Sequence, residues 1–465
     1  MPYFFNTPDD RQTMLAAIGA GSVDELFAAI PAELRLARPL DIPPAMCEME
    51  LTRHVSALAA KNSGAGKKAC FLGGGSYDHF VPAAVDAICS RGEFYTSYTP
   101  YQPEVSQGNL QAMFEYQTLV CQLTGLDVSN ASLYDGGSAS VEGVLMCMGI
   151  TKRERKVVVA ESVHPEYRQI VRTYLADRGT ELVTVPAPGG VIAAADLDKA
   201  VDGETACVLI QHPNFFGCLE DVRTAASIAH DKGALLVQSF DPISLGLLKR
   251  PGDLGADVAV AEGQSLGSPM SYGGPYLGIM ACREAFVRRM PGRIAGQTVD
   301  RRGNRCWVLT LQTREQHIRR EKATSNICTN QGLYALRASV YLALMGPQGL
   351  REVAELCTQK AHYAAKRIAG GAATGAKSTS GRFELPFAAP FFKEFVVRDN
   401  RGEVERLLAE ATQSGFLAGV PLARWYPKLA DSFLVTVTEN RTRAEIDALG
   451  QCLEKAGSPA AGSHA

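Results

Sequence analysis

Between about residue 66 and residue 325, short apolar runs alternate with amphipathic helical segments, and this alternation limits the fold more than any other feature of the sequence. The segment Val222–Lys232 is typical, because it ends at Gly233, where a left-handed cap costs little, and an apolar run follows at once. Repeated strand–helix–strand units predict a mainly parallel sheet covered by helices. The apolar runs of buried-strand type are Val157–Ala160, Cys207–Ile210, Leu235–Val237, Val258–Val260 and Tyr276–Met280.

The segments on either side of this region differ from it. Residues 1–65 predict a helical arm, in which Thr7–Asp10 can begin a helix and Ser22–Glu25 resembles a capping box. Residues 326–450 predict a small α+β domain that opens with a helix around Gln331–Leu344 and closes with a helix capped at Thr442. The tail, residues 451–465, consists largely of small residues and is expected to be disordered.

Composition narrows the classes of partner. The 47 basic and 49 acidic residues are interspersed and give a net charge of −2, so nucleic acid and membrane surfaces are not expected as partners. Twelve cysteines without a CxxC pair indicate neither a metal site nor a disulfide framework. No signal-type segment or long apolar window is present, so we expect a soluble cytoplasmic protein whose partners are small molecules or other proteins.

Two stretches have the composition of binding loops. Tyr95–Gly108 combines three tyrosines, two prolines and several amides, which suits a rigid recognition loop as well as it suits a proline-braced connection. In Leu133–Gly143 the residues Gly136, Gly137 and Ser138 precede a small-residue helix. The N–H groups at such a helix start can hold a phosphate, although the same pattern is more often a tight capped turn.

Two further stretches follow in the second half of the chain. Glu262–Pro275 comes directly after an expected strand and contains no lysine. Arg319–Thr329 leads from a basic run into hydroxyl and amide groups, which could approach an anion or simply cap the helix that follows.

Three segments in the right order carry a resemblance to a known family: Thr99–Gly108, Ser162–Arg168 and Glu321–Thr329. They resemble the glycine decarboxylase (P-protein) family of the glycine cleavage system, in the form whose N-terminal half is a separate subunit 1. The resemblance covers nearly the whole chain. It implies an α/β fold of the aspartate-aminotransferase-like type (fold type I) of pyridoxal phosphate enzymes. Such a fold has a large domain with a mainly parallel sheet, here residues 66–325, a small C-terminal α+β domain, and active sites at subunit interfaces.

The resemblance also predicts what this chain lacks. Gln264 stands where the Schiff-base lysine is expected, and a glutamine amide cannot form an imine. The acidic partner of the pyridine nitrogen is expected near Ser239 or Asp241. Lys249 is the nearest other lysine, but its surroundings indicate an exposed connection.

The implied activity therefore needs a second subunit. A lysine-bearing subunit 2 is expected to bind pyridoxal phosphate and glycine, and the aminomethyl group left after decarboxylation is expected to pass to the lipoyl arm of the H-protein. No catalytic residue of this chain's own and no metal are expected. The residues expected near substrate or lipoyl are Tyr95, Tyr98, Pro100, Tyr101, Gln102, Glu104, Ser106 and Gln107; those expected near the cofactor across the interface are Thr324, Ser325 and Asn326; and remnants of a degenerate site are Gly136, Gly137, Ser138, His164 and Gln264.

Two other functions stay open on the sequence alone. The chain could be a self-sufficient pyridoxal phosphate decarboxylase or aminotransferase that uses Lys249 or another lysine. It could also be a non-catalytic scaffold that stabilises an enzyme complete without it. The many polar and aromatic residues in the matched stretches favour a half-site over a scaffold.

Overall fold

The computed structural model describes residues 6–36, 38–323, 325–370 and 381–456. It divides into two compact units at Ser63 and Gly64. The described part of the first unit contains α1 (Pro8–Ala17), two short 3-10 turns (Asp24–Phe27 and Ala32–Leu34) and α2 (Glu48–Ala60). None of its described side chains is buried, so this unit has no hydrophobic core of its own.

The two caps expected in the first unit have different outcomes. Thr7 caps α1 as expected, because its hydroxyl accepts from the N–H of Asp10 at 3.2 Å and the Asp10 carboxylate accepts from the N–H of Thr7 at 2.8 Å. The capping box at Ser22 forms only in part: its hydroxyl accepts from the N–H of Glu25 at 3.4 Å, but only a 3-10 turn follows. The Glu25 carboxylate accepts from the N–H of Gly21 at 2.8 Å, one residue earlier than a capping box requires.

The second unit is built around a seven-stranded sheet of order β2-β8-β7-β6-β5-β3-β4. Strands β7, β6, β5, β3 and β4 are mutually parallel, while β8 runs antiparallel to β7 and β2 runs antiparallel to β8. The expected mainly parallel sheet is thus confirmed, with an antiparallel edge. The strands are β2 (Val128–Ser129), β3 (Lys156–Ala160), β4 (Glu181–Val185), β5 (Thr205–His212), β6 (Leu235–Phe240), β7 (Val258–Glu262) and β8 (Gly278–Cys282).

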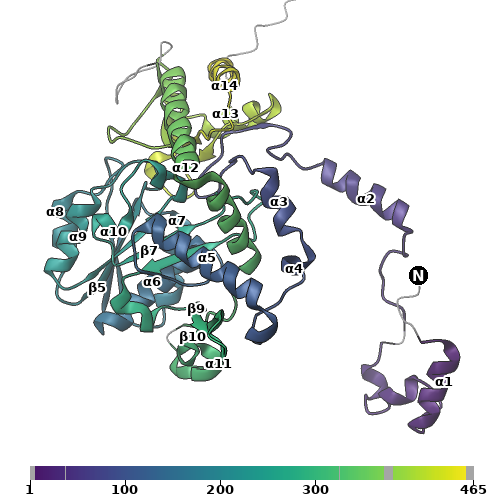
Figure 1. Cartoon of the computed structure of the whole chain (residues 1–465). Coiled ribbons are helices and arrows are strands. Elements are labelled where there is room, and N and C mark those ends of the chain that lie inside the picture. The colour runs from purple at the N-terminus through teal and green to yellow at the C-terminus, as the bar shows by residue number, and fades with distance from the viewer. Residues whose placement is uncertain (1–5, 37, 324, 371–380, 457–465) are drawn as a thin grey trace, which may run out of the picture. The chain divides into compact units, whose positions relative to one another are not determined.

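Helices enclose this sheet and create two hydrophobic cores (Figure 1). One core packs α6, α7 and α9 against the sheet, and the other packs α5 and the first half of α12 against it. The predicted helix 222–232 is observed as α9, which is followed by Gly233 at a φ of +71°. The helices are α3 (Ala83–Cys89), α4 (Gly92–Tyr95), α5 (Gln107–Thr124), α6 (Gly136–Thr151), α7 (Pro165–Leu175), α8 (Ala194–Ala200), α9 (Val222–Asp231), α10 (Pro251–Leu254) and α11 (Gln316–Arg319).

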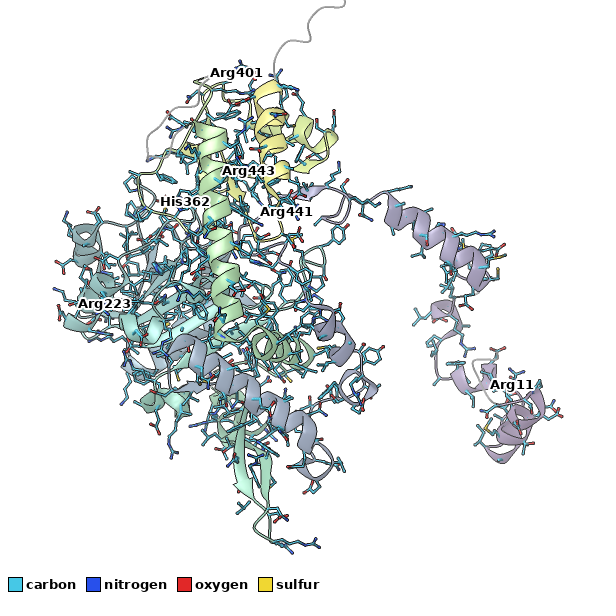
Figure 2. The ribbon with its side chains drawn as sticks, turned by 45° about the horizontal axis from the view of Figure 1, so that its top comes forward. Arg11, Arg223, His362, Arg401, Arg441 and Arg443 are labelled. Atoms are coloured by element: carbon cyan, nitrogen blue, oxygen red, sulfur yellow. The ribbon has the colours of Figure 1, made fainter. Side chains whose placement is uncertain are left out.

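The helix expected around Gln331–Leu344 is the first part of α12 (Gly332–Ala369), which bends at Gly346 just before Pro347. Its second half packs on a four-stranded antiparallel sheet of order β11-β12-β15-β14 (Figure 1). Figure 2 labels Arg443, the first residue of α14. The side chain of Arg443 donates to the hydroxyl of Tyr363 on α12 at 3.1 Å and so links the two helices. This sheet and its helices contain β11 (Phe383–Glu384), β12 (Glu394–Asp399), β14 (Val420–Pro421), β15 (Ser432–Thr436), α13 (Val404–Gln413) and α14 (Arg443–Lys455).

The end of α14 differs from the expected boundary at residue 450. The helix continues to Lys455 because Leu453 is fully buried in the core beneath it. The remainder of the tail expected to be disordered, residues 457–465, lies outside the described residues.

Two strand pairs were not expected from the sequence. β9 (Ile294–Val299) and β10 (Arg305–Thr310) form an antiparallel hairpin, and β1 (Ala69–Cys70) pairs in parallel with β13 (Phe416–Leu417). In the described part of the chain, no helix combines the length and the apolar character needed to cross a membrane.

Candidate active site

The carboxyl ends of the central strands converge on a small centre, named the closed centre because side chains fill nearly all of it. Ser239 and Asp241 come at and just after the end of β6, and Glu262 ends β7 beside the start of α6. The remaining cavity is about 20 Å³. It is lined by Gly75, Tyr77, His164, Tyr167, Gln211, Ser239, Phe240, Asp241, Pro242 and Glu262.

Gln264 is buried and does not line this cavity, and both atoms of its side-chain amide bind the backbone. Its oxygen accepts from the N–H of Tyr77 at 2.9 Å, and its nitrogen donates to the carbonyls of Tyr77 at 3.0 Å and Ser268 at 2.7 Å. Its neighbours Gly263 and Ser265 carry no amine either. In the segment after β7, Gln264 therefore holds the backbone in place, and no group there could form an imine.

At the start of α6 the sequence left a phosphate-binding turn and a tight capped turn open, and the structure shows a capped turn whose N–H groups bind the chain's own carboxyl groups. The N–H of Gly136 donates to Glu262 at 2.9 Å, and Ser138 forms a capping box with Asp135. Glu262 also accepts from the N–H groups of Gln264 and Leu277, each at 3.0 Å. Burial raises the pKa of Glu262 to about 8, against the opposing effect of its N–H donors.

His164 is also engaged on every side. Its ring stacks on Tyr167 with centroids 4.4 Å apart, Nε2 lies 2.7 Å from the carbonyl oxygen of Gly74, and Nδ1 accepts from the N–H of Glu166 at 3.2 Å. Burial lowers the pKa of His164 to about 4, so the imidazole is neutral at neutral pH. Since Nδ1 is an acceptor, Nε2 carries the proton and donates to Gly74.

A residue that the sequence did not single out, Lys393, supplies the cation of this centre. Its ammonium lies 2.7 Å from an Asp241 carboxylate oxygen, 3.0 Å from His79 Nε2 and 3.5 Å from the ring centroid of Tyr77. No sequence pattern marks this residue, since it reaches Asp241 from a strand start more than a hundred residues away. Lys249, by contrast, is exposed and does not line the cavity.

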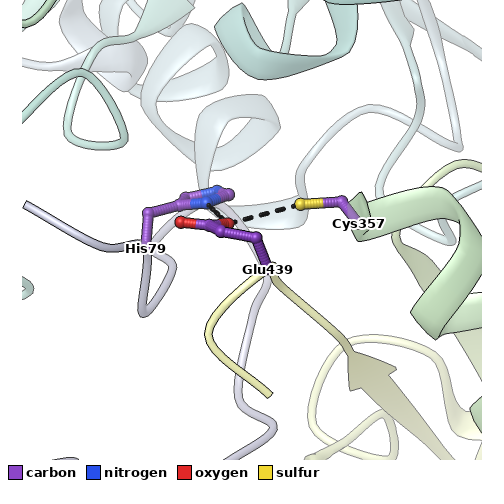
Figure 3. Close-up of side chains that lie close together, drawn as sticks. All are labelled: His79, Cys357 and Glu439. Atoms are coloured by element: carbon purple, nitrogen blue, oxygen red, sulfur yellow. Dashed lines mark hydrogen bonds and ion pairs between the residues drawn. The ribbon is translucent and has the colours of Figure 1, made fainter. Parts of the chain in front are cut away.

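The network continues from His79 to Glu439 and Cys357 (Figure 3). His79 Nδ1 is 2.6 Å from the Glu439 carboxylate, and the Cys357 thiol is 3.5 Å from the same oxygen. These three side chains have the ligand types of a metal site. However, the ammonium of Lys393 adjoins His79 on its other nitrogen, and each group already has a hydrogen-bond partner, so we interpret the cluster as a buried hydrogen-bond network.

The closed centre does not fit pyridoxal phosphate, the cofactor that the resemblance implies. The cavity of about 20 Å³ has room for about one water molecule, which needs about 10–15 Å³ on the same measure, and is far too small for a pyridine ring with its phosphate. The Glu262 carboxyl group occupies the helix start, and the Lys393 amine is paired with Asp241. The chain's own centre is therefore a filled structural element.

A second pocket, of about 260 Å³ and named the open pocket, lies where the stretch Tyr95–Gly108 meets the end of the stretch Arg319–Thr329. The Tyr95 and Tyr98 side chains are 68% and 83% exposed on one side of it, and Thr329 and Asn330 form part of the other side. The lining residues are Phe94, Tyr95, Ser97, Tyr98, Thr99, Pro100, Asn109, Ala112, Met113, Thr329, Asn330, Gly332, Leu333, Ala335 and Leu336.

The other residues of the first stretch lie around this pocket or away from it. The Tyr101 hydroxyl accepts from Arg293 at 3.1 Å, while Gln102 and Glu104 are exposed and Ser106 is half-buried. Gln107 binds the backbone of Trp307 through both ends of its amide, each at 2.9 Å. Gln107 thus fixes the β9–β10 hairpin to α5 and does not line the pocket.

The residues expected near a cofactor across the interface have separate surroundings. Ser325 is half-buried and its hydroxyl accepts from the N–H of Ile327 at 3.0 Å, while Asn326 is exposed. Thr324 lies outside the described residues. Burial raises the pKa of Glu142 on α6 to about 7, and a hydrogen bond from Ser325 opposes this shift.

Comparison with known proteins gives consistent matches over the whole chain. A family model described as "Glycine cleavage system P-protein" matches residues 2–453. Two relatives are named probable glycine dehydrogenase (decarboxylating) subunit 1. The one in Desulforamulus reducens is 52% identical and covers 97% of this chain and 98% of its own length. The one in Carboxydothermus hydrogenoformans is 51% identical and covers 97% of this chain and 99% of its own length.

Solved structures agree with these matches. A crystal structure of an inhibitor-bound glycine decarboxylase (P-protein) of the glycine cleavage system has 43% identity and a TM-score of 0.89, over 98% of this chain and 100% of that chain. A sphingosine-1-phosphate lyase from Burkholderia pseudomallei has 14% identity and a TM-score of 0.65, over 92% of this chain and 94% of its own. Together they confirm the expected fold type I of pyridoxal phosphate enzymes.

We expect the isolated chain to form no aldimine with pyridoxal phosphate at Lys393, because that ammonium is paired and the cavity beside it is filled. The measurement is the aldimine absorption band after incubation with the cofactor, followed by borohydride reduction and peptide mass analysis. Lys393→Met and Lys249→Met are the control variants. A stoichiometric pyridoxyl adduct that disappears in Lys393→Met would contradict the closed centre, and one that disappears in Lys249→Met would instead favour a self-sufficient enzyme.

Glu142 should make folding stability depend on pH. Its pKa of about 7 in the folded chain exceeds the ordinary value of 4.5, so the folded state keeps a proton that the unfolded state releases. Stability should therefore fall as pH rises from 4.5 to 7, by up to about 3 kcal/mol from this group. Urea unfolding of the wild type and Glu142→Gln across this range should give the variant the shallower fall; equal slopes would refute the assignment.

Proposed function

The chain belongs to the glycine cleavage system P-protein family, and from this premise we propose that it is subunit 1 of a two-subunit glycine dehydrogenase (decarboxylating). In this proposal subunit 2 carries the Schiff-base lysine and holds pyridoxal phosphate, and this chain completes the reaction site across the subunit interface. The name subunit 1 of the relatives supports a partner subunit.

One observation carries the proposal: the chain closes its own fold type I centre and leaves a tyrosine-lined pocket open. The closed centre has no free amine and about 20 Å³ of space. The open pocket has about 260 Å³ and combines residues from two stretches that are more than two hundred positions apart. A chain with this pair of features suits a role at another subunit's site.

The chemistry of the proposed pair divides between the subunits. Pyridoxal phosphate on subunit 2 supplies an electron sink for the bond that breaks when glycine loses carbon dioxide. The lipoyl arm of the H-protein takes the remaining aminomethyl group. The residues of this chain line the approach, exclude water with the exposed rings of Tyr95 and Tyr98, and present polar groups such as Asn330.

The closed centre also weighs against a self-sufficient enzyme. Lys249 is exposed outside the cavity, and Lys393 is committed to Asp241. A scaffold role would not explain why Tyr98, which is 83% exposed, lines a pocket together with polar groups such as Asn330. We place the pair in the cytoplasm, which the uncrosslinked state of the twelve cysteines supports.

Reconstitution tests the proposed function directly. We expect no release of carbon dioxide from glycine by this chain alone, little by the lysine-bearing subunit alone, and full activity when both are mixed with cofactor and lipoylated H-protein. The reason is that each chain supplies only part of the site. Release by this chain alone, or full activity of the partner alone, would overturn the proposal.

The exposed tyrosines should matter for this activity. Tyr98→Ala removes a ring that is 83% exposed in this chain and should lower kcat/KM of the reconstituted pair by about tenfold, the usual effect of losing an aromatic interface contact. Tyr174→Ala is the matched control, since Tyr174 is 49% exposed on α7 outside the pocket. Equal kcat/KM for the two variants would remove Tyr98 from the site.

A further inference from the structure

Arg293, which precedes β9, is a buried cation without an acidic partner in the described part of the chain. Its side chain is 2% exposed and is among the largest fully buried side chains. One guanidinium nitrogen donates to the Asn330 side-chain oxygen at 3.2 Å and another donates to the Tyr101 hydroxyl at 3.1 Å. Its Nε has no partner there. Burying a charge without an opposite charge is costly, so this arrangement calls for a purpose.

Arg293 joins the two stretches that border the open pocket. Asn330 lines the pocket, and Tyr101 follows Pro100, which also lines it. The Asn330 side chain donates to the carbonyl of Ala131 at 3.0 Å, and the N–H of Ala131 donates to the carbonyl of Arg293 at 2.7 Å. These bonds link Arg293, Asn330 and Ala131 in a ring and so fix Asn330 and Arg293 relative to each other. Tyr101 is held to Arg293 by the hydrogen bond to its hydroxyl and by the guanidinium over its ring.

The bond from Arg293 also decides the direction of the Tyr101 proton. A guanidinium group only donates, so the Tyr101 oxygen is the acceptor in this bond and its own proton points elsewhere. In the described part of the chain no acceptor takes that proton, and the Tyr101 side chain is 53% exposed. A hydroxyl that accepts from a buried cation is polarised toward donating, which suits an anionic oxygen as its partner.

We propose that Arg293 is a positioning residue that holds the Tyr101 hydroxyl as a donor to an anionic oxygen brought across the subunit interface. This inference rests on the proposed function and adds to it a recognition element of stated chemistry. The carboxylate of glycine and the phosphate of the cofactor on subunit 2 share that chemistry. In either case the anion restores the charge balance that the buried guanidinium lacks.

The test uses the reconstituted pair with the variants Arg293→Met, Arg293→Lys, Tyr101→Phe and the double variant Arg293→Met/Tyr101→Phe. Four readouts are needed: KM for glycine, kcat, retention of pyridoxal phosphate, and the thermal midpoint. Tyr174→Phe and Arg153→Met are the matched controls. Arg153 also donates two hydrogen bonds, to the backbone carbonyls of Thr205 and Lys232, but it is half-buried and its partners do not line the pocket.

Loss of a charge-assisted hydrogen bond predicts a change of about tenfold or more in one binding constant. A raised KM for glycine identifies the carboxylate as the anion, and weakened retention of the cofactor identifies the phosphate. The double variant should be no worse than the more affected single variant, because Arg293 acts through Tyr101. Arg293→Lys should restore part of the loss, and both controls should leave both constants unchanged.

The opposite pattern would overturn the inference. An Arg293→Met variant that only lowers the thermal midpoint, with KM and cofactor retention unchanged, makes Arg293 purely structural. If that variant does not fold, a Tyr101→Phe pair with unchanged KM and unchanged cofactor retention overturns the inference in the same way. An inactive wild-type pair instead refutes the proposed function, so the two failures are distinguishable.

Discussion

The closed centre depends on one hydrogen bond, in which the first N–H of α6 donates to the Glu262 carboxyl group. Glu262 ends β7, and its three N–H donors come from the start of α6, the turn after β7 and the entry to β8. One side chain therefore ties together two strands and a helix at the edge where enzymes of this fold bind their cofactor. The Glu262 oxygen accepts the first N–H of the helix, so the contact that organises the centre also blocks the position where the helix start could bind an anion.

Lys393 also helps to keep a cofactor out of the closed centre, because it occupies the space next to Asp241. Its ammonium faces Asp241, one of the two residues near which the acidic partner of a pyridine nitrogen was expected, and the Tyr77 ring packs against the ammonium. A carboxyl group at the helix start, a cation beside Asp241 and an aromatic ring against that cation are thus all supplied by the chain. Buried ion pairs contribute little net stability compared with apolar packing, but removing one partner is costly. The pair therefore fixes the geometry of this centre more than it adds to stability.

Much of the fold could be predicted from the sequence because its signals are local. The apolar runs became β3, β5, β6, β7 and β8, and capping residues such as Thr7 and Thr442 set helix starts, since strand burial and caps depend on neighbouring residues. Pairings over long separations could not be predicted. β1 meets β13 and Lys393 meets Asp241 only through the tertiary fold. The same limit applies to the open pocket: the two stretches were recognised separately, but Arg293, the residue that joins them, carries no local signal.

The two sites differ in whether their buried cation has a counter-charge among the described residues, and this difference is the strongest physical argument for their roles. In the closed centre the Lys393 ammonium is paired with Asp241, and the side chains of Gln264, His164 and Glu262 have hydrogen-bond partners. At the open pocket a buried guanidinium lacks a counter-charge and large aromatic rings face solvent. Unpaired charge and exposed rings both carry a cost that a contacting subunit can relieve. Since Arg293 is bonded to Asn330, which lines the same pocket as Tyr95 and Tyr98, one partner surface that brings an anion would relieve both costs together.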